Sequence, residues 1–512
     1  MNGVSLQSLT RPRSCGKRMG QVARIRIVLF RLRILSAVVI ACFLVVPSAR
    51  AADPSPLIAT HGFAAADIGY LLVEIDTGRP MAAWQADHPF VPGSVLKLAT
   101  GLMAWHVLGV DFRFTTRLWQ KDDALYLQGS GDPVLDAVDL RAFAQALGAA
   151  RPQARWHHFY IDTAAIVPAA QISDRQPVAA DYNPGFGALN VDFNRLAVSR
   201  VTDQAASAWQ VRSLADNLTV PVDWVAVTPS PMPLPAGAPF VPVEIGKAPP
   251  VDNWWFVPSL SASGASAKDT FFLPVKQADL MTARIFRTIA GGMGIVLPEP
   301  QNGNVPKDAD LLATHVSPAL PELLQGLLRY SNNLSAELIG LTAAGKTAGH
   351  SLDIVAAADR QAKWLAKELP KTGWTDFRMK NFSGLDGDNR NTPQQMAAIV
   401  KAIGMDAALA ASLPDLALPG ERDAIKTAAG WRITGKSGTM DYAAGLAGLI
   451  TRPDGRQYAY VIFLADDRRR GELAAGFDPR ILHPAGNGRA WTLRARQLET
   501  DLLLAWLDQI SK

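Results

Sequence analysis

The sequence predicts an α+β fold in which two regions of mixed helices and strands enclose a long β-rich segment. Residues 68–108 and 308–512 alternate strand-like runs with helical patterns. Residues 114–307 contain short β-like runs separated by loops rich in Pro, Gly and Ser. At 512 residues the chain is long enough for about two to four domains.

The first predicted elements are a β-hairpin and a helix. Ile68–Ile75 is strand-like, Asp76-Thr77-Gly78 is a turn, and Met81–Trp84 continues as the second strand. Pro92-Gly93 then breaks the chain, and the spacing of apolar residues predicts a helix over Ser94–Leu108.

The later elements follow from the same patterns. Helical periodicity returns at Pro318–Ala344 and Ile354–Leu369. Arg452-Pro453-Asp454-Gly455 is a strong turn signal between two apolar runs, and it predicts a second hairpin. Leu493–Ile510 is an amphipathic helix, which we expect to pack on a sheet. A membrane-surface position is the less favoured alternative, because the helix carries little excess positive charge.

The net charge of +5 belongs to the first 51 residues. They hold nine of the 51 lysines and arginines and no Asp or Glu. The remaining 42 basic residues face 46 acidic ones, a net charge of −4. The rest of the chain therefore lacks the basic surface that nucleic-acid binding requires.

Residues 1–51 have the pattern of a secretory signal peptide. A basic region precedes the apolar run Ile34–Val46, and Ala49-Arg50-Ala51 fits a cleavage site. Met19 is an alternative start, and lipidation at Cys42 or retention as a membrane anchor are alternatives to cleavage. This pattern predicts an exported protein, periplasmic or extracytoplasmic. Both cysteines lie in the leader, so we expect no disulfide and no thiolate chemistry in the mature chain.

Ser94-Val95-Leu96-Lys97 is the first candidate catalytic motif. On a helix, residues three apart lie on one face, so the Lys97 amine can reach the Ser94 hydroxyl. A serine becomes nucleophilic when an adjacent base takes its proton. The motif is weak alone, since a helix-capping serine is the common alternative and Ser14-Cys15-Gly16-Lys17 matches it inside the leader.

Two further elements follow in the order expected for Ser-x-x-Lys acyl-enzymes. Ser331-Asn332-Asn333 supplies Ser-x-Asn, with helix capping again as the alternative. Lys436-Ser437-Gly438 supplies Lys-[Ser/Thr]-Gly and leads into a strand rich in Gly and Ala. Lys371-Thr372-Gly373 has the same pattern but follows a predicted helix, which its glycine would end.

Other chemistries fit the sequence poorly. Gly430–Ser437 matches a phosphate-binding loop, but such a loop needs a strand before it and a helix after it, and here a strand follows. The eight histidines, including the neighbours His157 and His158, lack metal-binding spacing, so we expect no metal or cofactor. No Gly-x-Ser-x-Gly elbow occurs, which argues against an α/β-hydrolase.

The chain resembles the D-Ala-D-Ala carboxypeptidase/endopeptidase family, the low-molecular-mass class C penicillin-binding proteins. The resemblance covers nearly all residues after the leader. It includes the three motifs and the following segments: Arg113-Phe114-Thr115, Gly129–Pro133, Ala188–Asn194, His315–Pro318, Ala336-Glu337, Ser383-Gly384-Leu385, Asp388-Asn389-Arg390 and Thr392-Pro393. The position of the last three segments marks Lys371-Thr372-Gly373 as a chance match.

This resemblance implies a β-lactamase/transpeptidase-like domain, an antiparallel five-stranded sheet with helices on both faces. A large β-rich insertion would follow the nucleophile helix. The expected boundaries are 1–51 for the signal peptide, 52–114 and 308–512 for the two parts of the transpeptidase-like domain, and 115–307 for the insertion.

The resemblance also implies residue roles. Ser94 would be the acylated nucleophile, Lys97 its base, and Ser331 a proton relay to the leaving D-alanine. Asn333 would hold the substrate amide, and Lys436, with Ser437 nearby, the terminal carboxylate. The backbone N–H groups of Ser94 and Thr439 would form the oxyanion hole.

Met440 is a separate hypothesis. It lies two strand positions after Gly438, where its side chain would border the pocket for the residue penultimate to the scissile bond, a long stem residue. A long, adaptable side chain suits an aliphatic stem residue, and a core methionine is the alternative.

We therefore expect a serine-type carboxypeptidase, with possible endopeptidase action, on peptidoglycan stem peptides. β-Lactam antibiotics would be its inhibitors. A β-lactamase of the same fold is an alternative, but no Glu-x-x-Leu-Asn segment is present to position a hydrolytic water. A non-catalytic peptidoglycan-binding protein is the other alternative, disfavoured because every polar catalytic position is filled.

Overall fold

The computed structural model describes residues 55–511 except 153, 202–207, 235–239, 244–252, 257–269, 418–429 and 482–487. All of these described residues belong to one compact unit, Pro54–Lys512. The predicted leader, with Cys15 and Cys42, lies outside them. Within the described part of the chain, no helix is long and apolar enough to cross a membrane.

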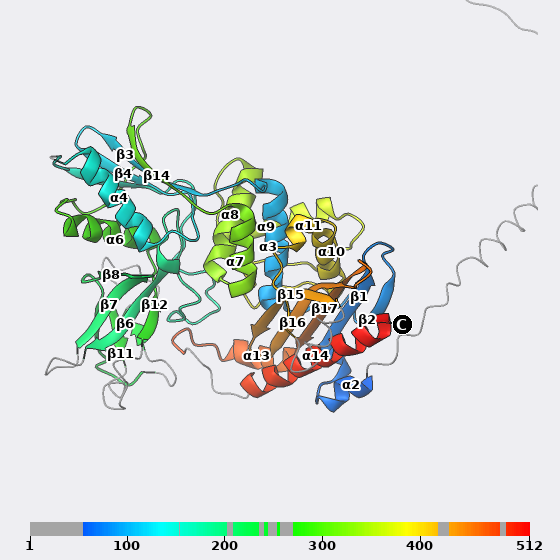
Figure 1. Ribbon diagram of the computed structural model, residues 1–512. Coiled ribbons are helices and arrows are strands. Elements are labelled where there is room, and N and C mark those ends of the chain that lie inside the picture. Colours follow the sequence, from blue (N-terminus) through cyan, green and yellow to red (C-terminus); the bar gives the residue numbers. More distant parts are fainter. Residues whose placement is uncertain are drawn as a thin grey trace, which may run out of the picture. The chain divides into compact units, whose positions relative to one another are not determined.

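An antiparallel five-stranded sheet joins the two ends of this unit (Figure 1). Its strands, in spatial order, are β15 (Arg432–Met440), β16 (Ala443–Thr451), β17 (Gln457–Ala465), β1 (Ile68–Glu74) and β2 (Pro80–Trp84). β1 pairs with β17, with Leu72 opposite Tyr460, so the N-terminal hairpin extends the C-terminal strands. Both predicted hairpins are confirmed.

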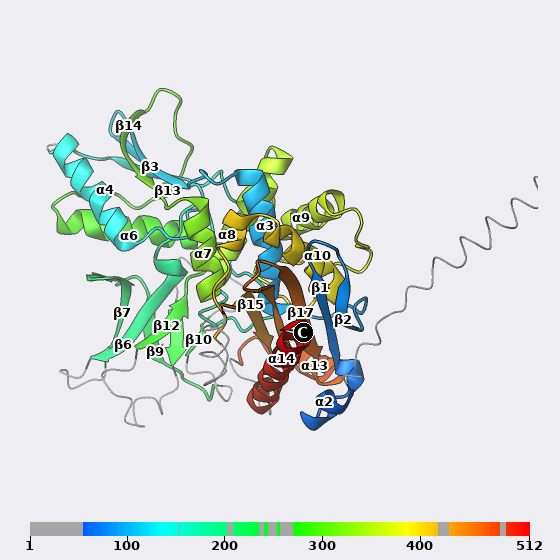
Figure 2. The same cartoon turned by 45° about the vertical axis from the view of Figure 1, so that its right-hand side comes forward.

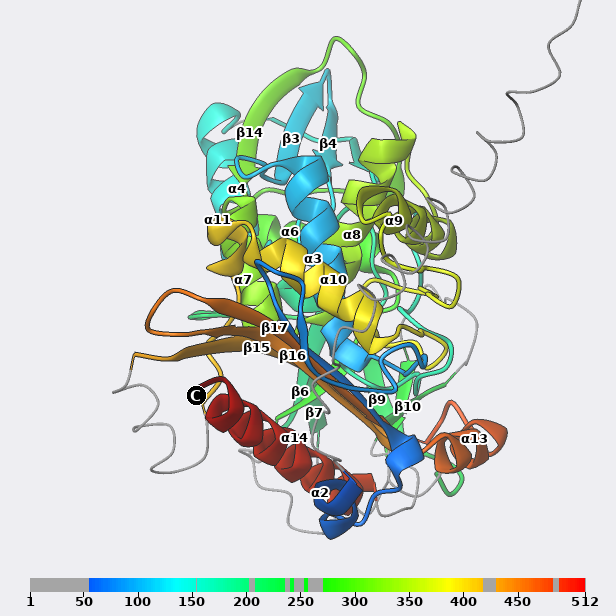
Figure 3. The same cartoon turned by 90° about the vertical axis from the view of Figure 1, so that its right-hand side faces the viewer.

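Helices cover both faces of this sheet, as the resemblance implied (Figure 3). One face carries α3 (Lys97–Leu108), α7 (Leu320–Tyr330), α8 (Asn333–Ala348), α9 (Ile354–Glu368), α10 (Pro393–Gly404) and α11 (Ala407–Ala410). The other face carries α14 (Gly488–Ser511) and α2 (Ser55–Thr60), with α13 (Asp467–Ala475) beyond its end.

Side chains along each strand point alternately to the two faces of the sheet, and each face packs into its own hydrophobic core. On β1, Tyr70 and Leu72 pack with α14, while Leu71 and Val73 pack with the helices of the opposite face. The C-terminal helix thus lies on the sheet as predicted, and its residue Trp506 is almost fully buried there.

The chain between α3 and α7 forms a separate group of sheets around a core of its own (Figures 1 and 2). A mixed sheet has the order β13 (Gln301–Asn302), β5 (His158–Asp162), β4 (Ala124–Gln128), β3 (Thr115–Lys121) and β14 (Asp310–Val316). An antiparallel sheet contains β12 (Thr270–Pro274), β6 (Arg195–Val201), β7 (Ala208–Ala215) and β8 (Leu218–Pro221). A small sheet contains β10 (Phe240–Pro242), β11 (Asn253–Phe256) and β9 (Ala226–Pro229).

This inserted region differs from the expectation in two ways. Its described residues include the helices α4 (Ala137–Ala150) and α6 (Ala278–Gly292), which pack against each other, so helices accompany the predicted β-rich structure. Its sheet also runs past the expected limit at 307, because β14 pairs with β3, with His315 opposite Thr116. The predicted boundary is therefore too early, since the pairing of two strands so far apart in sequence leaves no local signal.

Candidate active site

Ser94 lies in a 3₁₀ turn, Gly93–Leu96, immediately before α3. Pro92 is the N-cap residue of this turn and Leu96 is the N-cap residue of α3, and neither forms a capping hydrogen bond with its side chain. The Ser94 hydroxyl instead lies 2.9 Å from the Lys97 amine. The capping-serine alternative is therefore wrong, and the Ser-x-x-Lys motif brings its two polar groups together.

Glycines allow three backbone segments to meet around Ser94. A methyl group on Gly438 of β15 would lie 2.8 Å from the Ser94 backbone nitrogen, and one on Gly93 would lie 3.2 Å from the nitrogen of Thr439. Gly384, at φ +79°, packs directly against the carbonyl of Gly93. Side chains at these positions would push the strand and loop away from the nucleophile.

The Lys97 amine has three neighbours. It lies 2.8 Å from Asn333 Oδ1, 2.8 Å from the Ser383 carbonyl and 2.9 Å from Ser94 Oγ. Asn333 Nδ2 donates to the Tyr182 carbonyl at 3.0 Å, which fixes the amide so that its oxygen faces the lysine. A neutral amine has two N–H donors and one lone pair. The two carbonyl-type acceptors take the donors, so the lone pair faces the Ser94 hydroxyl.

The surroundings of Lys97 favour this neutral form. The side chain is completely buried on α3. Burial, and then the positive charge of Lys436, hold the pKa of Lys97 well below its usual value, while Glu337 opposes them.

Glu337 is a buried carboxylate that sequence reasoning noted without assigning a role. It projects from α8, is fully buried, and accepts the backbone N–H groups of Phe382 and Ser383, both at 2.9 Å. Burial raises its pKa to about 7, against the effect of those hydrogen bonds and of Lys97. Glu337 therefore anchors the loop whose Ser383 carbonyl contacts the lysine.

The Ser-x-Asn motif forms the turn between α7 and α8. Ser331 ends α7 in a left-handed conformation, at φ 58° and ψ 31°. The cap of α8 is Asn332, whose side chain accepts from Ser335 N at 2.9 Å. Capping is thus the task of Asn332, and the turn leaves Asn333 free to reach Lys97.

The third motif lies along β15 on the opposite wall. Lys436 is nearly buried, at 4% exposure, and donates to the Ser437 carbonyl at 2.8 Å. Burial, and then the neighbouring Arg496, lower the pKa of Lys436 to about 8. Ser437 and Thr439 are exposed, and Met440 is partly buried at the end of the strand. Binding of a carboxylate requires a protonated Lys436. In this environment the side chain loses its proton at mildly alkaline pH, because its pKa is lowered to about 8.

Arg496 is a residue of this wall that sequence reasoning missed. From α14 its guanidinium donates to the Gly438 carbonyl at 2.8 Å and to the Thr439 hydroxyl, and it pairs with buried Glu499 at 2.7 Å. Arginine stays charged at every physiological pH. Arg496 therefore adds a fixed positive charge beside the motif, from a helix that lies 60 residues further along the chain than Lys436.

The competing motifs do not share this arrangement. Lys371-Thr372-Gly373 lies in the turn after α9, where Thr372 N donates to the Leu369 carbonyl. The phosphate-loop match fails because Arg432–Met440 is a strand, so no helix follows it, while residues 422–429 lie outside the described residues. Within the described part, no cluster of three or more His, Cys, Asp or Glu could hold a metal ion.

Comparison with known proteins gives consistent results. A model of the D-Ala-D-Ala carboxypeptidase 3 (S13) family matches residues 57–476. A D-alanyl-D-alanine carboxypeptidase of Actinomadura sp. (strain R39) is 24% identical over 415 residues, 76% of each chain.

Solved structures share the fold. Penicillin binding protein 4 from Haemophilus influenzae has a TM-score of 0.62 at 18% identity, covering 86% of this chain and 96% of that one. The same protein complexed with a β-lactam gives 0.60 at the same identity and coverage. Because the family model spans most of the sequence, this chain is a member of the S13 family of D-Ala-D-Ala carboxypeptidases.

Proposed function

We propose that this enzyme cleaves the terminal D-Ala-D-Ala bond of peptidoglycan stem peptides through an acyl-enzyme on Ser94, and that β-lactams acylate the same serine. The observation that carries the proposal is the position of the Lys97 amine. It is buried, its pKa is held well below the usual value, and it lies 2.9 Å from the Ser94 hydroxyl. A base so placed can take the serine proton as the oxygen attacks.

In the acylation step, Ser94 Oγ bonds to the carbonyl carbon of the penultimate D-alanine, and its proton passes to Lys97. The developing oxyanion would accept hydrogen bonds from the N–H groups of Ser94 and Thr439. The close approach of the two backbone segments at Gly93 and Gly438 supports this assignment. The carbon–nitrogen bond then breaks. Ser331 would relay the proton from Lys97 to the leaving D-alanine nitrogen.

In the deacylation step, water adds to the acyl carbon and Ser94 regains its proton. The product is a stem peptide shortened by one D-alanine, and the same chemistry on a cross-linked peptide would be an endopeptidase reaction. Asn333 would orient the substrate amide. Lys436 and Ser437 would hold the terminal carboxylate, with Met440 bordering the pocket for the long stem residue that precedes the two D-alanines.

Digestion of purified muropeptides tests this function. With uncross-linked pentapeptide muropeptides we expect release of D-alanine, and with cross-linked dimers any endopeptidase activity gives monomers, both read by mass spectrometry. Ser94→Ala should abolish both reactions. Product formation that persists in Ser94→Ala would refute the assigned nucleophile.

The proposed site of action is outside the cytoplasm. The substrate is a cell-wall polymer, and residues 1–51 have the pattern of an export signal. Cell fractionation with an antibody against the folded part should recover the protein in the periplasmic or extracytoplasmic fraction. Replacing Ile34–Val46 by polar residues should retain it in the cytoplasm.

A further inference from the structure

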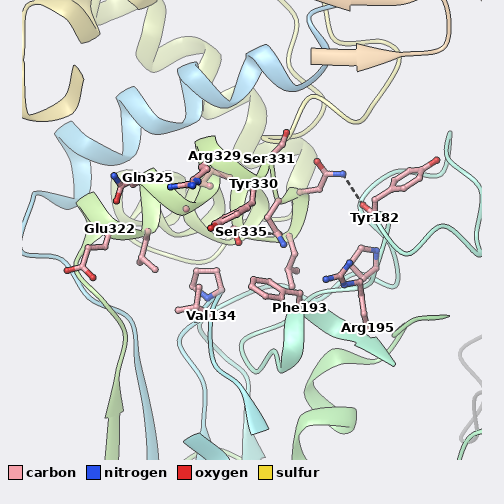
Figure 4. A pocket seen from close by; sticks show the side chains of 18 of the residues that line it. Val134, Tyr182, Phe193, Arg195, Glu322, Gln325, Arg329, Tyr330, Ser331 and Ser335 are labelled. Atoms are coloured by element: carbon pink, nitrogen blue, oxygen red, sulfur yellow. Dashed lines mark hydrogen bonds between the residues drawn. The ribbon is translucent and has the colours of Figure 1, made fainter. Parts of the chain in front are cut away.

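A large cavity lies beside the Ser-x-Asn turn, between α7 and the inserted region (Figure 4). Its volume is about 820 Å³. One wall is α7 with the start of α8, and the other is formed by the loop around Tyr182 and the turn at Phe193. A cavity of this size accommodates a small organic group such as a sugar ring or two.

Two aromatic rings project into the cavity, Tyr330 from the α7 wall and Phe193 from the inserted region (Figure 4). Tyr330 is 75% exposed and Phe193 is 38% exposed, although both are residues that proteins generally bury at least in part. Exposed rings of this kind, in a concave site with polar groups at its rim, are typical of ligand binding.

The backbone at Phe193 is strained in a way that fixes this ring. Asp192, Phe193 and Asn194 have successive φ values of 49°, 55° and 53°, a left-handed run without glycine. The buried Asn194 side chain holds it, donating to the Gly185 carbonyl at 2.9 Å and to Asn190 Oδ1 at 2.8 Å. Such strain persists where surrounding contacts enforce it, and it is concentrated at functional sites.

The cavity adjoins Lys97 at Asn333, beside Tyr182. Asn333 lines the cavity and contacts both Lys97 and the Tyr182 carbonyl. The Tyr182 hydroxyl points away from the cavity (Figure 4). It lies 3.5 Å from Gln176 Oε1, and Gln176 Nε2 donates to the Leu385 carbonyl at 3.0 Å. A methyl group on Gly387, in the same loop as Leu385, would lie 4.0 Å from Met440 Cε. Tyr182 therefore borders both the cavity and the Met440 end of β15.

This placement matters because of the direction in which the substrate runs. With its terminal carboxylate at Lys436, a stem peptide lying along β15 would extend toward Met440 and Tyr182. The three stem residues before the penultimate D-alanine span roughly 10 Å when extended. Beyond them the stem is attached to an amino sugar, so the sugar arrives where the cavity begins.

We propose that the cavity lined by Tyr330 and Phe193 binds the N-acetylated amino sugar that carries the stem peptide. The inference rests on the proposed function. The hydrocarbon face of a sugar ring packs on aromatic rings, and Glu322 and Gln325 at the rim offer partners for its hydroxyl and acetamide groups. The charged residues of the lining balance, because Arg195, which pairs with Asp181 at 3.3 Å, and Arg329, which lies over the Tyr330 ring, face the carboxylates of Asp181 and Glu322. A cavity without net charge suits an uncharged ligand better than an acidic peptide.

The test compares a disaccharide-pentapeptide with the same pentapeptide lacking sugar, by D-alanine release from each. We expect the wild type to favour the sugar-bearing substrate by about tenfold in kcat/KM, mainly through KM. Tyr330→Ala should reduce this preference to within about twofold while leaving turnover of the sugar-free pentapeptide and penicillin acylation within about twofold. Phe193→Ala should lower the preference in the same direction.

The matched control is Leu311→Ala, an exposed apolar position on β14 outside the cavity, which should keep the full preference. A wild type that treats the two substrates alike, or a preference that survives both aromatic substitutions, would overturn the proposal. So would equal slowing of both substrates in Tyr330→Ala, which would assign the cavity to the peptide. Penicillin acylation and sugar-free turnover report separately on the proposed catalytic function.

Discussion

Two walls meet at Ser94, and each contains a buried lysine in a different environment. The helical wall is α3 with the start of α8, and the strand wall is β15. On the helical wall, the fully buried Lys97 contacts two carbonyl-type acceptors and the nucleophile, and its pKa is held well below the usual range. On the strand wall, Lys436 retains its proton up to about pH 8 beside the fixed charge of Arg496. In the proposed mechanism the helical wall accepts a proton and the strand wall attracts an anion, so exchanging the two environments should disable both tasks.

The largest expected effect comes from removing the proton acceptor. Arginine resembles lysine in length but does not deprotonate in a protein, so Lys97→Arg should be as inactive as Lys97→Ala. We expect both to lose at least about a hundredfold in the second-order rate of penicillin acylation. If Lys97→Arg acylates within about tenfold of wild type, the serine has another base.

The next effect tests how the helical wall positions Lys97. Glu337→Gln places an amide NH₂ against a backbone N–H, so the loop at Ser383 should shift and acylation should fall about tenfold. Because Glu337 raises the pKa of Lys97, its neutralisation should also move the acidic limb of the acylation–pH profile to lower pH. Glu337→Asp, which keeps the charge, should leave that limb near its wild-type position. A fall in rate with an unchanged limb would reduce Glu337 to a structural role.

Lys436 on the strand wall predicts that the rate of acylation falls as the pH rises, the opposite of the dependence expected from Lys97. Lys436 is charged below its pKa of about 8 and neutral above it, so acylation should decline as the pH rises through 8 to 9. Lys436→Arg should move this decline to higher pH and retain measurable acylation, whereas Lys436→Ala should lose more at every pH. An identical alkaline limb in wild type and Lys436→Arg would mean that another group titrates there.

The smallest effect concerns the far end of the strand wall. Met440 is partly buried and approaches Gly387, so it remains a candidate for the pocket of the long stem residue that precedes the two D-alanines. Met440→Asp should slow stem-peptide turnover several-fold more than penicillin acylation, because the antibiotic lacks the long stem residue. Equal losses for the two reactions would favour the core-methionine alternative.

Local patterns in the sequence predicted most of the helical wall and the sheet. Ser94 and Lys97 are one turn apart, and Ser331 and Asn333 lie within one short turn, so spacing alone indicated their proximity. Residues brought in by tertiary packing were harder to predict. Arg496 reaches β15 from a helix whose pattern indicated only a buried face, and the strained turn at Phe193 depends on contacts with Asn190 and Gly185 that spacing does not specify.

The sequence also did not indicate how the pKa values of Lys97 and Lys436 would be shifted. The resemblance assigned Lys97 as the base and Lys436 to the terminal carboxylate, without indicating the surroundings that set the pKa of each side chain. The lowered pKa of Lys436 arises from burial and from Arg496, and neither was visible without the packing of α14 on the sheet.

The central claim is that the two walls converge on Ser94. The most direct measurement is intact mass spectrometry after incubation with labelled penicillin, followed by peptide mapping. We predict a mass increase of one antibiotic, with the label on the peptide that contains Ser94, and no increase in Ser94→Ala. Labelling that persists in Ser94→Ala, or that maps to Ser331, would contradict the account.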